Sequence, residues 1–161
     1  MHLLLWVKDR LRLSEIDGSI SAEIPSIESD PKLYEIVTSQ LIHGPCGQMD
    51  LPGKPSICMD VASNKCKKNF PKKFTSETML NQDGYPAYRR RSPSDGGNTF
   101  TIKKQGVEMV VDNSWVVPYS PVLCRMFECH INVEVAHSIK SIKYVCKVWS
   151  LILFSPQFFS I

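Results

Sequence analysis

The chain has 161 residues, which is enough for one domain with a hydrophobic core and too few for two independent ones. Hydrophobic residues make up 43% of it and charged residues 22%, and this composition excludes a wholly disordered chain. The formal net charge is +3, and the basic residues cluster late in the sequence, in "KCKKNFPKK", "YRRRSP", "TIKK" and "SIKSIKYVCK". Basic clusters that contain aromatic residues suit a polyanion, most simply nucleic acid, and any single cluster fits solvated surface charge equally well.

The two ends of the sequence contain short apolar runs. "MHLLLWVKDR" lacks a basic region before its apolar residues, and "VWSLILFSPQFFSI" is too short to span a bilayer and is interrupted by Pro156. We therefore expect no membrane partner. Six cysteines without a secretory signal predict a reducing intracellular compartment, where they are free thiols or metal ligands.

The first half of the chain predicts one strand, one helix and a long loop. Residues 2–7, "HLLLWV", are typical of a buried strand. Residues 31–42 predict a helix with Asp30 as its cap and Pro31 in its first turn. From 44 to 98 the sequence is rich in Gly, Pro, Asn, Ser and Asp, which predicts mostly loop. A loop of this length inside a compact domain needs an organiser, and a metal ion is one candidate.

The second half predicts more strand than helix. "TFTIKKQGVEMVVD" is typical of a hairpin that turns at Gln105 and Gly106, and residues 130–135, "HINVEV", predict a further strand. Residues 138–149 follow as an amphipathic helix. This irregular alternation predicts an α+β fold with a largely antiparallel sheet.

The long loop carries one set of residues with metal-ligand spacing. His43, Cys46, Cys58 and Cys66 form a His-x2-Cys-x11-Cys-x7-Cys pattern, and one imidazole with three thiolates makes a suitable tetrahedral shell for structural zinc. The alternative is a set of scattered small apolar residues and a surface histidine. The other cysteines lie in apolar contexts, and we expect them to be core thiols: Cys124, Cys129 and Cys146.

Six motifs occur along the chain in a specific order: "SAEIP", "IHGPCG", "DGYPAYRRRSP", "VDNSWVVPYSP", "HINVEV" and "SIKYVCK". In this order they resemble the Helitron helicase-like domain, which is the replication-initiator-type nuclease region of Helitron rolling-circle transposases. The resemblance extends from His2 to about Lys147. It implies a nuclease of the His-hydrophobic-His (HUH) architecture that uses Mg²⁺ or Mn²⁺, acts on single-stranded DNA in the nucleus and, in full-length members, precedes a helicase domain.

The resemblance also implies roles for individual residues. Tyr144 corresponds to the nucleophile that attacks a phosphodiester, and Lys147 to the lysine of the Tyr-x-x-Lys-Tyr pattern, while Val148 stands where the second tyrosine is expected. His2 corresponds to the second histidine of the pair that holds the catalytic divalent ion, so the first would precede Met1. Because the members of such a site act as a unit, we expect this chain alone to be inactive or nearly so.

Basic residues near these motifs are candidates for binding DNA phosphates. Arg89, Arg90 and Arg91 follow a turn, with a solvated loop as the alternative. Lys140 and Lys143 share a helical stripe close to Tyr144. His130 and Glu134 receive no role, because a structural histidine is the simpler interpretation.

We divide the chain into residues 1–148, a partial Helitron helicase-like domain, and residues 149–161, a divergent apolar tail. The expected fold is therefore an incomplete α+β fold that resembles HUH nucleases. It has an antiparallel sheet, flanking helices and a long loop that a zinc ion can stabilise. Two functions stay open. One is a nuclease-derived domain that nicks single-stranded DNA, and the other is a catalytically dead, zinc-stabilised remnant that binds nucleic acid or has no function.

Overall fold

The computed structural model describes residues 12–47, 56–60, 62–81, 85–104 and 107–135. Within these ranges the chain is α+β, as predicted, and every strand pairing is antiparallel. The strands form three separate two-stranded sheets. The helices are α1 (Leu13–Ser19), α2 (Pro31–Gln40) and α3 (Pro121–Phe127), with 3-10 turns at η1 (Pro93–Asp95) and η2 (Asn113–Trp115). The strands are β1 (Met59–Asp60), β2 (Lys65–Cys66), β3 (Met79–Leu80), β4 (Pro86–Ala87), β5 (Phe100–Lys104) and β6 (Val107–Val111). No described helix is long and apolar enough to cross a membrane.

Helix α2 confirms the prediction for residues 31–42, two residues shorter than expected. The Asp30 side chain accepts a hydrogen bond from the backbone N–H of Leu33 at 3.0 Å, and Pro31 occupies the first turn, where no N–H is needed. Leu33, Ile36 and Val37 point into the core. The helix therefore begins where its sequence caps it and is held by its apolar face.

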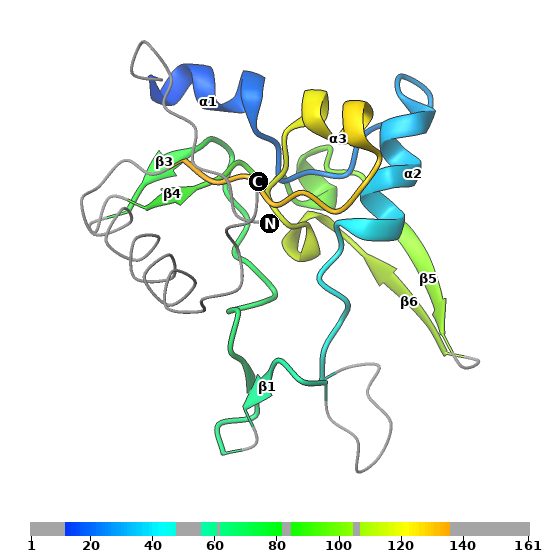
Figure 1. Cartoon of the computed structure of the whole chain (residues 1–161). Coiled ribbons are helices and arrows are strands. Elements are labelled where there is room, and N and C mark those ends of the chain that lie inside the picture. The colour runs from blue at the N-terminus through cyan, green and yellow to red at the C-terminus, as the bar shows by residue number, and fades with distance from the viewer. Residues whose placement is uncertain (1–11, 48–55, 61, 82–84, 105–106, 136–161) are drawn as a thin grey trace, which may run out of the picture.

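Helix α3 packs beside α2, and the sequence did not predict it (Figure 1). It has seven residues, of which only Cys124 is buried. Two ion pairs connect the helices: Arg125 contacts Asp30, and Lys32 lies 2.5 Å from Glu128. Because seven residues are too few for a helix that is stable alone, this helix depends on its contacts with α2.

Strands β5 and β6 confirm the predicted hairpin. Phe100 pairs with Val111 and Lys104 with Val107 at opposite ends of the ladder. In the long loop region 44–98 the described residues contain only two-residue strands and one 3-10 turn, which agrees with the predicted lack of regular structure.

The predicted strand at residues 130–135 is wrong. The backbone N–H of Val133 donates to the carbonyl of Pro118 at 3.0 Å, but proline has no N–H with which to continue a ladder. The N–H of Val135 donates instead to the hydroxyl of Tyr88 at 2.8 Å. The segment is therefore a loop fixed by isolated contacts. The predicted strand 2–7 and helix 138–149 lie outside the described residues.

Three buried clusters make up the core. The helical core joins α2 and α3 to the segment after η2, and its buried members are Ile24, Leu33, Ile36, Val37, Leu41, Val116, Tyr119 and Cys124. A second cluster comprises Cys46, Met59, Cys66, Val111 and Trp115, and a third comprises Ile16, Ile20, Ala22 and Tyr88. The second cluster contains two of the predicted zinc ligands, so this part of the core and the candidate metal site are continuous.

Candidate metal centre

The four predicted ligands come together from two short segments. His43 follows Ile42, whose bridge to Val116 fixes the start of the first segment, and the His43 N–H donates to the Trp115 carbonyl at 2.8 Å. Cys46 lies three residues later. The β1–β2 hairpin supplies the second pair of ligands, because Met59 pairs with Cys66 and the Lys67 N–H donates to the Cys58 carbonyl at 2.7 Å.

The distances within the cluster fit a tetrahedral ion. The ligand atoms of all four residues lie within 4.8 Å of one another. The Nε2 atom of His43 lies 3.6 Å from the Cys46 sulfur and 3.3 Å from the Cys66 sulfur. A tetrahedral zinc ion with bonds of about 2.0 Å to nitrogen and 2.3 Å to sulfur places those atoms about 3.5 Å apart. The cluster could therefore hold a metal such as zinc with little rearrangement.

The three thiols differ in their electrostatic surroundings. Burial raises the pKa of Cys46 to about 12, and its hydrogen bonds with the other two thiols add to this shift. Burial acts in the same direction on Cys66, but hydrogen bonds from the backbone N–H groups of Phe70 and Lys68 outweigh it and lower the pKa of that thiol. Backbone donors therefore favour the thiolate at Cys66, which is the form that binds metal.

His43 is held in its neutral form. Burial lowers the pKa of its imidazole, and the positive charges of Lys72 and Lys68 lower it further. A neutral imidazole has the free lone pair that a metal ligand requires. The protonation states that the surroundings favour at His43 and Cys66 thus both suit a metal site.

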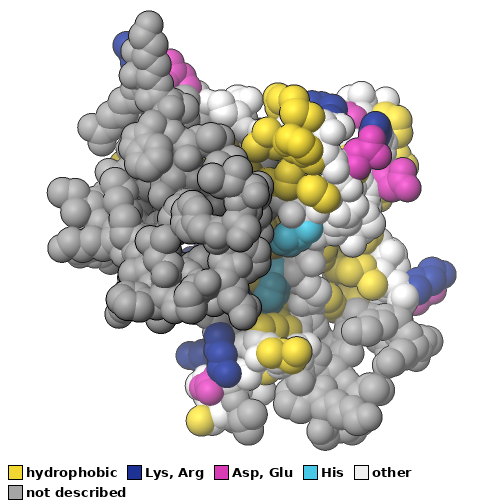
Figure 2. Space-filling view, in the orientation of Figure 1, with side chains coloured by type: hydrophobic (Ala, Val, Ile, Leu, Met, Phe, Trp, Pro, Cys, Tyr) yellow, Lys and Arg dark blue, Asp and Glu magenta, His cyan; other side chains and the backbone are white. Residues whose placement is uncertain are grey.

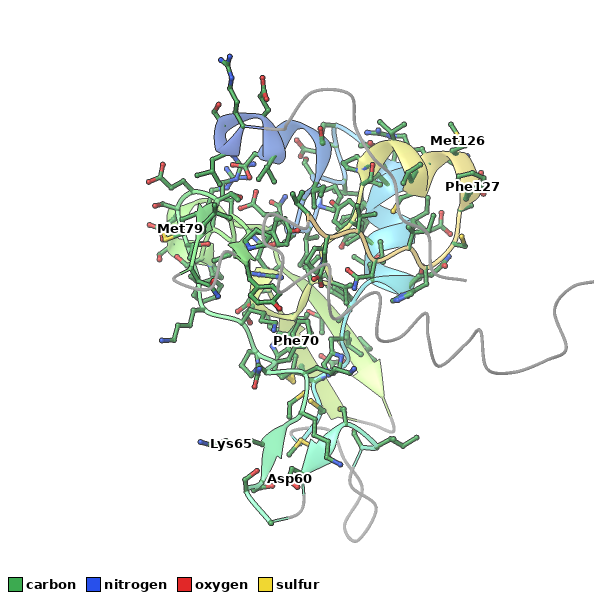
Figure 3. All side chains as sticks on the ribbon, turned by 60° about the vertical axis from the view of Figure 1, so that its left-hand side comes forward. Asp60, Lys65, Phe70, Met79, Met126 and Phe127 are labelled. Atoms are coloured by element: carbon green, nitrogen blue, oxygen red, sulfur yellow. The ribbon has the colours of Figure 1, made fainter. Side chains whose placement is uncertain are left out.

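Aromatic residues orient the histidine. The ring of Phe70 stacks on His43 with centroids 4.2 Å apart, and the buried Trp115 lies parallel to Phe70 with centroids 6.5 Å apart. The peptide bond between Phe70 and Pro71 is cis. Figure 3 shows Phe70 between the β1–β2 hairpin, which carries Asp60 and Lys65, and the rest of the chain. No sequence pattern predicted a role for Phe70, although it lies only four residues after Cys66 in the chain.

The structure gives the predicted DNA-binding arginines protein partners. Arg90 is 4% exposed, and its Nη1 donates to the carbonyls of Val116 at 2.6 Å, Asn113 at 2.7 Å and Ala22 at 3.3 Å. Burial lowers the pKa of Arg90 to about 10. In this conformation its guanidinium joins three segments of backbone and faces away from solvent, so it has a structural role.

Arg89 and Arg91 bind the buried carboxylate of Glu23. Arg91 contacts it through Nη2 at 2.7 Å and Nε at 2.9 Å, and Arg89 lies 3.3 Å from it. Burial raises the pKa of Glu23, but the hydrogen bonds from Arg91 and the charges of both arginines outweigh burial and hold that pKa below its ordinary value. Both arginines are also partly solvated, with side chains that are 38% and 44% exposed, so the solvated-loop alternative stays open for them. DNA binding by them stays a prediction.

The remaining predicted residues divide into two groups. Cys124 is a fully buried thiol, as predicted, whereas Cys129 is exposed, because the chain turns away from the core at Glu128, which has a φ of 48°. His130 is exposed and its Nδ1 lies 2.6 Å from the Gln40 carbonyl, and Glu134 is exposed. The following lie outside the described residues: His2, Lys140, Lys143, Tyr144, Cys146, Lys147 and Val148.

No protein-family model matches this chain, and no curated protein matches it. The Helitron resemblance therefore stays a hypothesis.

Proposed function

We propose that residues 43–73 form a zinc-organised module whose ion takes the place of an apolar core. The observation that carries this proposal is the convergence of one imidazole and three thiols within 4.8 Å. Three thiolates and a neutral histidine complete a tetrahedral shell without an open position, which is typical of structural and not of catalytic zinc. The free energy of zinc binding in such sites is about 10–16 kcal/mol in isolated peptides, so the ion contributes directly to folding.

The zinc content of the purified chain tests this proposal. We expect one zinc per chain, and cobalt substitution should give the intense visible absorption of tetrahedral thiolate coordination. Cys58→Ser with Cys66→Ser should reduce the zinc content to near zero. Cys129→Ser is the matched control, because this thiol is exposed and lies outside the cluster. If one equivalent of zinc persists in the double variant, the ligand set is wrong.

We further propose that the module belongs to a nuclease-derived domain of the Helitron type. This proposal is supported by the contacts among the motifs that carry the resemblance. Ser21 bridges to Tyr119, the Ile24 N–H donates to the Asn113 side chain at 2.7 Å, and Ile42 bridges to Val116. "YRRRSP" joins through Arg90 and Arg91, and "HINVEV" joins through Val133. Five of the six motifs thus form one connected set, as expected of residues that together specify a fold.

The ancestral function of that domain is the nicking of single-stranded DNA by the tyrosine at position 144, with a catalytic Mg²⁺ or Mn²⁺, and we expect this chain alone to be inactive or nearly so. Attack of the tyrosine hydroxyl on the phosphodiester forms a 5′-phosphotyrosine bond and releases a 3′-hydroxyl. The test is Mn²⁺-dependent formation of this covalent adduct on single-stranded DNA, with Tyr144→Phe as control. A cut that persists in Tyr144→Phe would exclude this nucleophile. Adduct formation that depends on Tyr144 would exclude the non-catalytic remnant, whereas a zinc-loaded chain without adduct agrees with both functions, because we expect little activity from this chain alone.

A further inference from the structure

An open pocket of about 630 Å³ lies directly against the metal cluster. Met59, Phe70 and Trp115 contribute its apolar lining, and Lys65, Lys72 and Lys73 contribute its cations. Lys65 comes from the β1–β2 hairpin and the other two lysines from the segment after the cis peptide. Figure 2 shows Lys and Arg side chains gathered at the end of the molecule where β1 lies. The pocket therefore combines positive charges with an apolar floor.

Lysines outnumber acids in the segment that contributes most of this pocket, and Glu134 is a further acid whose charge acts on Lys72. Residues 56–73 contain five lysines and a single acid, Asp60. A zinc ion bound by three thiolates and a neutral histidine carries one net negative charge. Together, Asp60 and the metal centre leave three of the five positive charges uncompensated. Such a surplus beside a concave surface attracts anions.

Lys72 is held in place within this pocket. It is half-buried, and its backbone N–H donates to the Ser114 carbonyl at 2.8 Å. Its ammonium lies 4.9 Å from the centroid of Phe70 and donates to the Lys68 carbonyl at 2.8 Å. Across the described residues, no carboxylate forms an ion pair with it. An oriented ammonium without a carboxylate partner has donors left for a ligand anion.

The type of basic side chain in the pocket indicates which phosphate-containing ligand it suits. Lysines are point charges that contact phosphates without selecting an orientation, whereas phosphopeptide sites are typically built from arginines that bind bidentately. Among the described residues, no arginine lines this pocket. Several lysines around a partly apolar surface match the grooves that follow the backbone of single-stranded nucleic acids.

We propose that this pocket binds the phosphate backbone of a nucleic-acid strand, with Lys65, Lys72 and Lys73 contacting successive phosphates. The proposal rests on the zinc-organised module, because the ion would join the hairpin that carries Lys65 to His43 and Cys46. The backbone N–H groups of His43 and Lys72 both donate to the backbone of the Ser114–Trp115 segment, which places the lysines on one surface. It assigns a nucleic-acid contact to lysines of the metal module, distinct from the predicted DNA-binding residues Arg89, Arg90 and Arg91.

Fluorescence anisotropy of the zinc-loaded full chain with a labelled twelve-nucleotide oligo-dT tests the proposal. The variant combines Lys65→Gln, Lys72→Gln and Lys73→Gln, and Lys32→Gln is the control, because Lys32 is exposed on α2 and pairs with Glu128. Each lost phosphate contact should reduce the salt slope, log Kobs against log salt, by about 0.7. We therefore expect the triple variant to lose about 2 from this slope and at least about tenfold in affinity, while Lys32→Gln stays within about twofold.

Zinc content separates the two proposals. A triple variant that retains one zinc per chain and binds DNA as the wild type does would overturn the pocket assignment alone. A wild-type chain that binds no zinc would overturn the zinc-organised module. Competition between labelled oligo-dT and two other anions, a phosphopeptide and heparin, identifies the class of ligand that the pocket prefers. Displacement of oligo-dT by heparin or phosphopeptide at equal or lower charge concentration would show a general anion site and contradict the nucleic-acid assignment.

Discussion

The helical core and the zinc-organised module are stabilised in different ways. The helical core buries eight side chains contributed by α2, α3 and the segments that pack on them. Within the described residues of the module, Met59 is the one large aliphatic side chain that is buried, and the other buried apolar residues include two of the thiols. Hydrophobic burial can therefore hold the first region together, whereas the proposed zinc ion would supply the stability of the second.

Removal of the metal ion should give the largest difference in stability between the two regions. We expect a strong chelator to open residues 56–73 and to leave α2 and α3 folded, because only the module depends on the ion. Trypsin cleavage after Lys67 and Lys68 should accelerate on the order of 100-fold, while cleavage after Lys32 and Arg125 changes little. Mass spectrometry of the early fragments measures both rates. Equal acceleration at all four residues would show that the two regions unfold as one.

Arg90→Met tests the hydrogen-bonded backbone network of the folded core. This change removes the Arg90 donor from the carbonyls of Ala22, Asn113 and Val116, of which Asn113 keeps a bond from the Val116 N–H, and should lower the free energy of unfolding by about 3 kcal/mol. Arg125→Met is the control, because the Arg125–Asp30 pair is partly exposed and should contribute less than about 1 kcal/mol. Urea unfolding measures both. If both variants retain about one zinc ion per chain, the change in the free energy of unfolding does not come from loss of the metal ion.

Phe70→Leu addresses the packing around the metal ligands. Loss of the ring that stacks on His43 should weaken zinc affinity about tenfold, because residues that orient a ligand typically contribute 10- to 100-fold. Phe74→Leu is the control, since that side chain is 43% exposed. Competition with a chelating dye measures the affinity. If both variants bind zinc equally, the ring does not position the ligand.

Glu23→Gln should give the smallest change in stability, and that change should depend on pH. The folded-state pKa of Glu23 is lowered from its ordinary 4.5, so its contribution is fully present above that pH and is lost as the pH falls below it. At pH 7 the variant should be less stable by about 1 kcal/mol, since both arginines are partly exposed. The difference from wild type should shrink as the pH falls below 4.5. A difference that stays constant down to acid pH would contradict the role of the charge.

Sequence patterns predicted the locally specified features. Helix α2 begins at its Asp30 cap, the β5–β6 hairpin turns where expected, and His43, Cys46, Cys58 and Cys66 meet as their spacing predicts. Each of these follows from contacts within a few residues or from one ligand pattern. The two short helices were not predicted, because α1 and α3 each have seven residues and one buried side chain.

The sequence by itself determined an α+β chain with a capped helix, a hairpin and a four-residue metal pattern in a long polar loop. Only the tertiary structure decided the role of each polar side chain. Arg90 lies where three backbone carbonyls converge, Arg91 binds a carboxylate 68 residues away, and residues 130–135 meet a proline that cannot complete a ladder. These outcomes depend on which distant groups fold against each residue, and no local pattern encodes that partner.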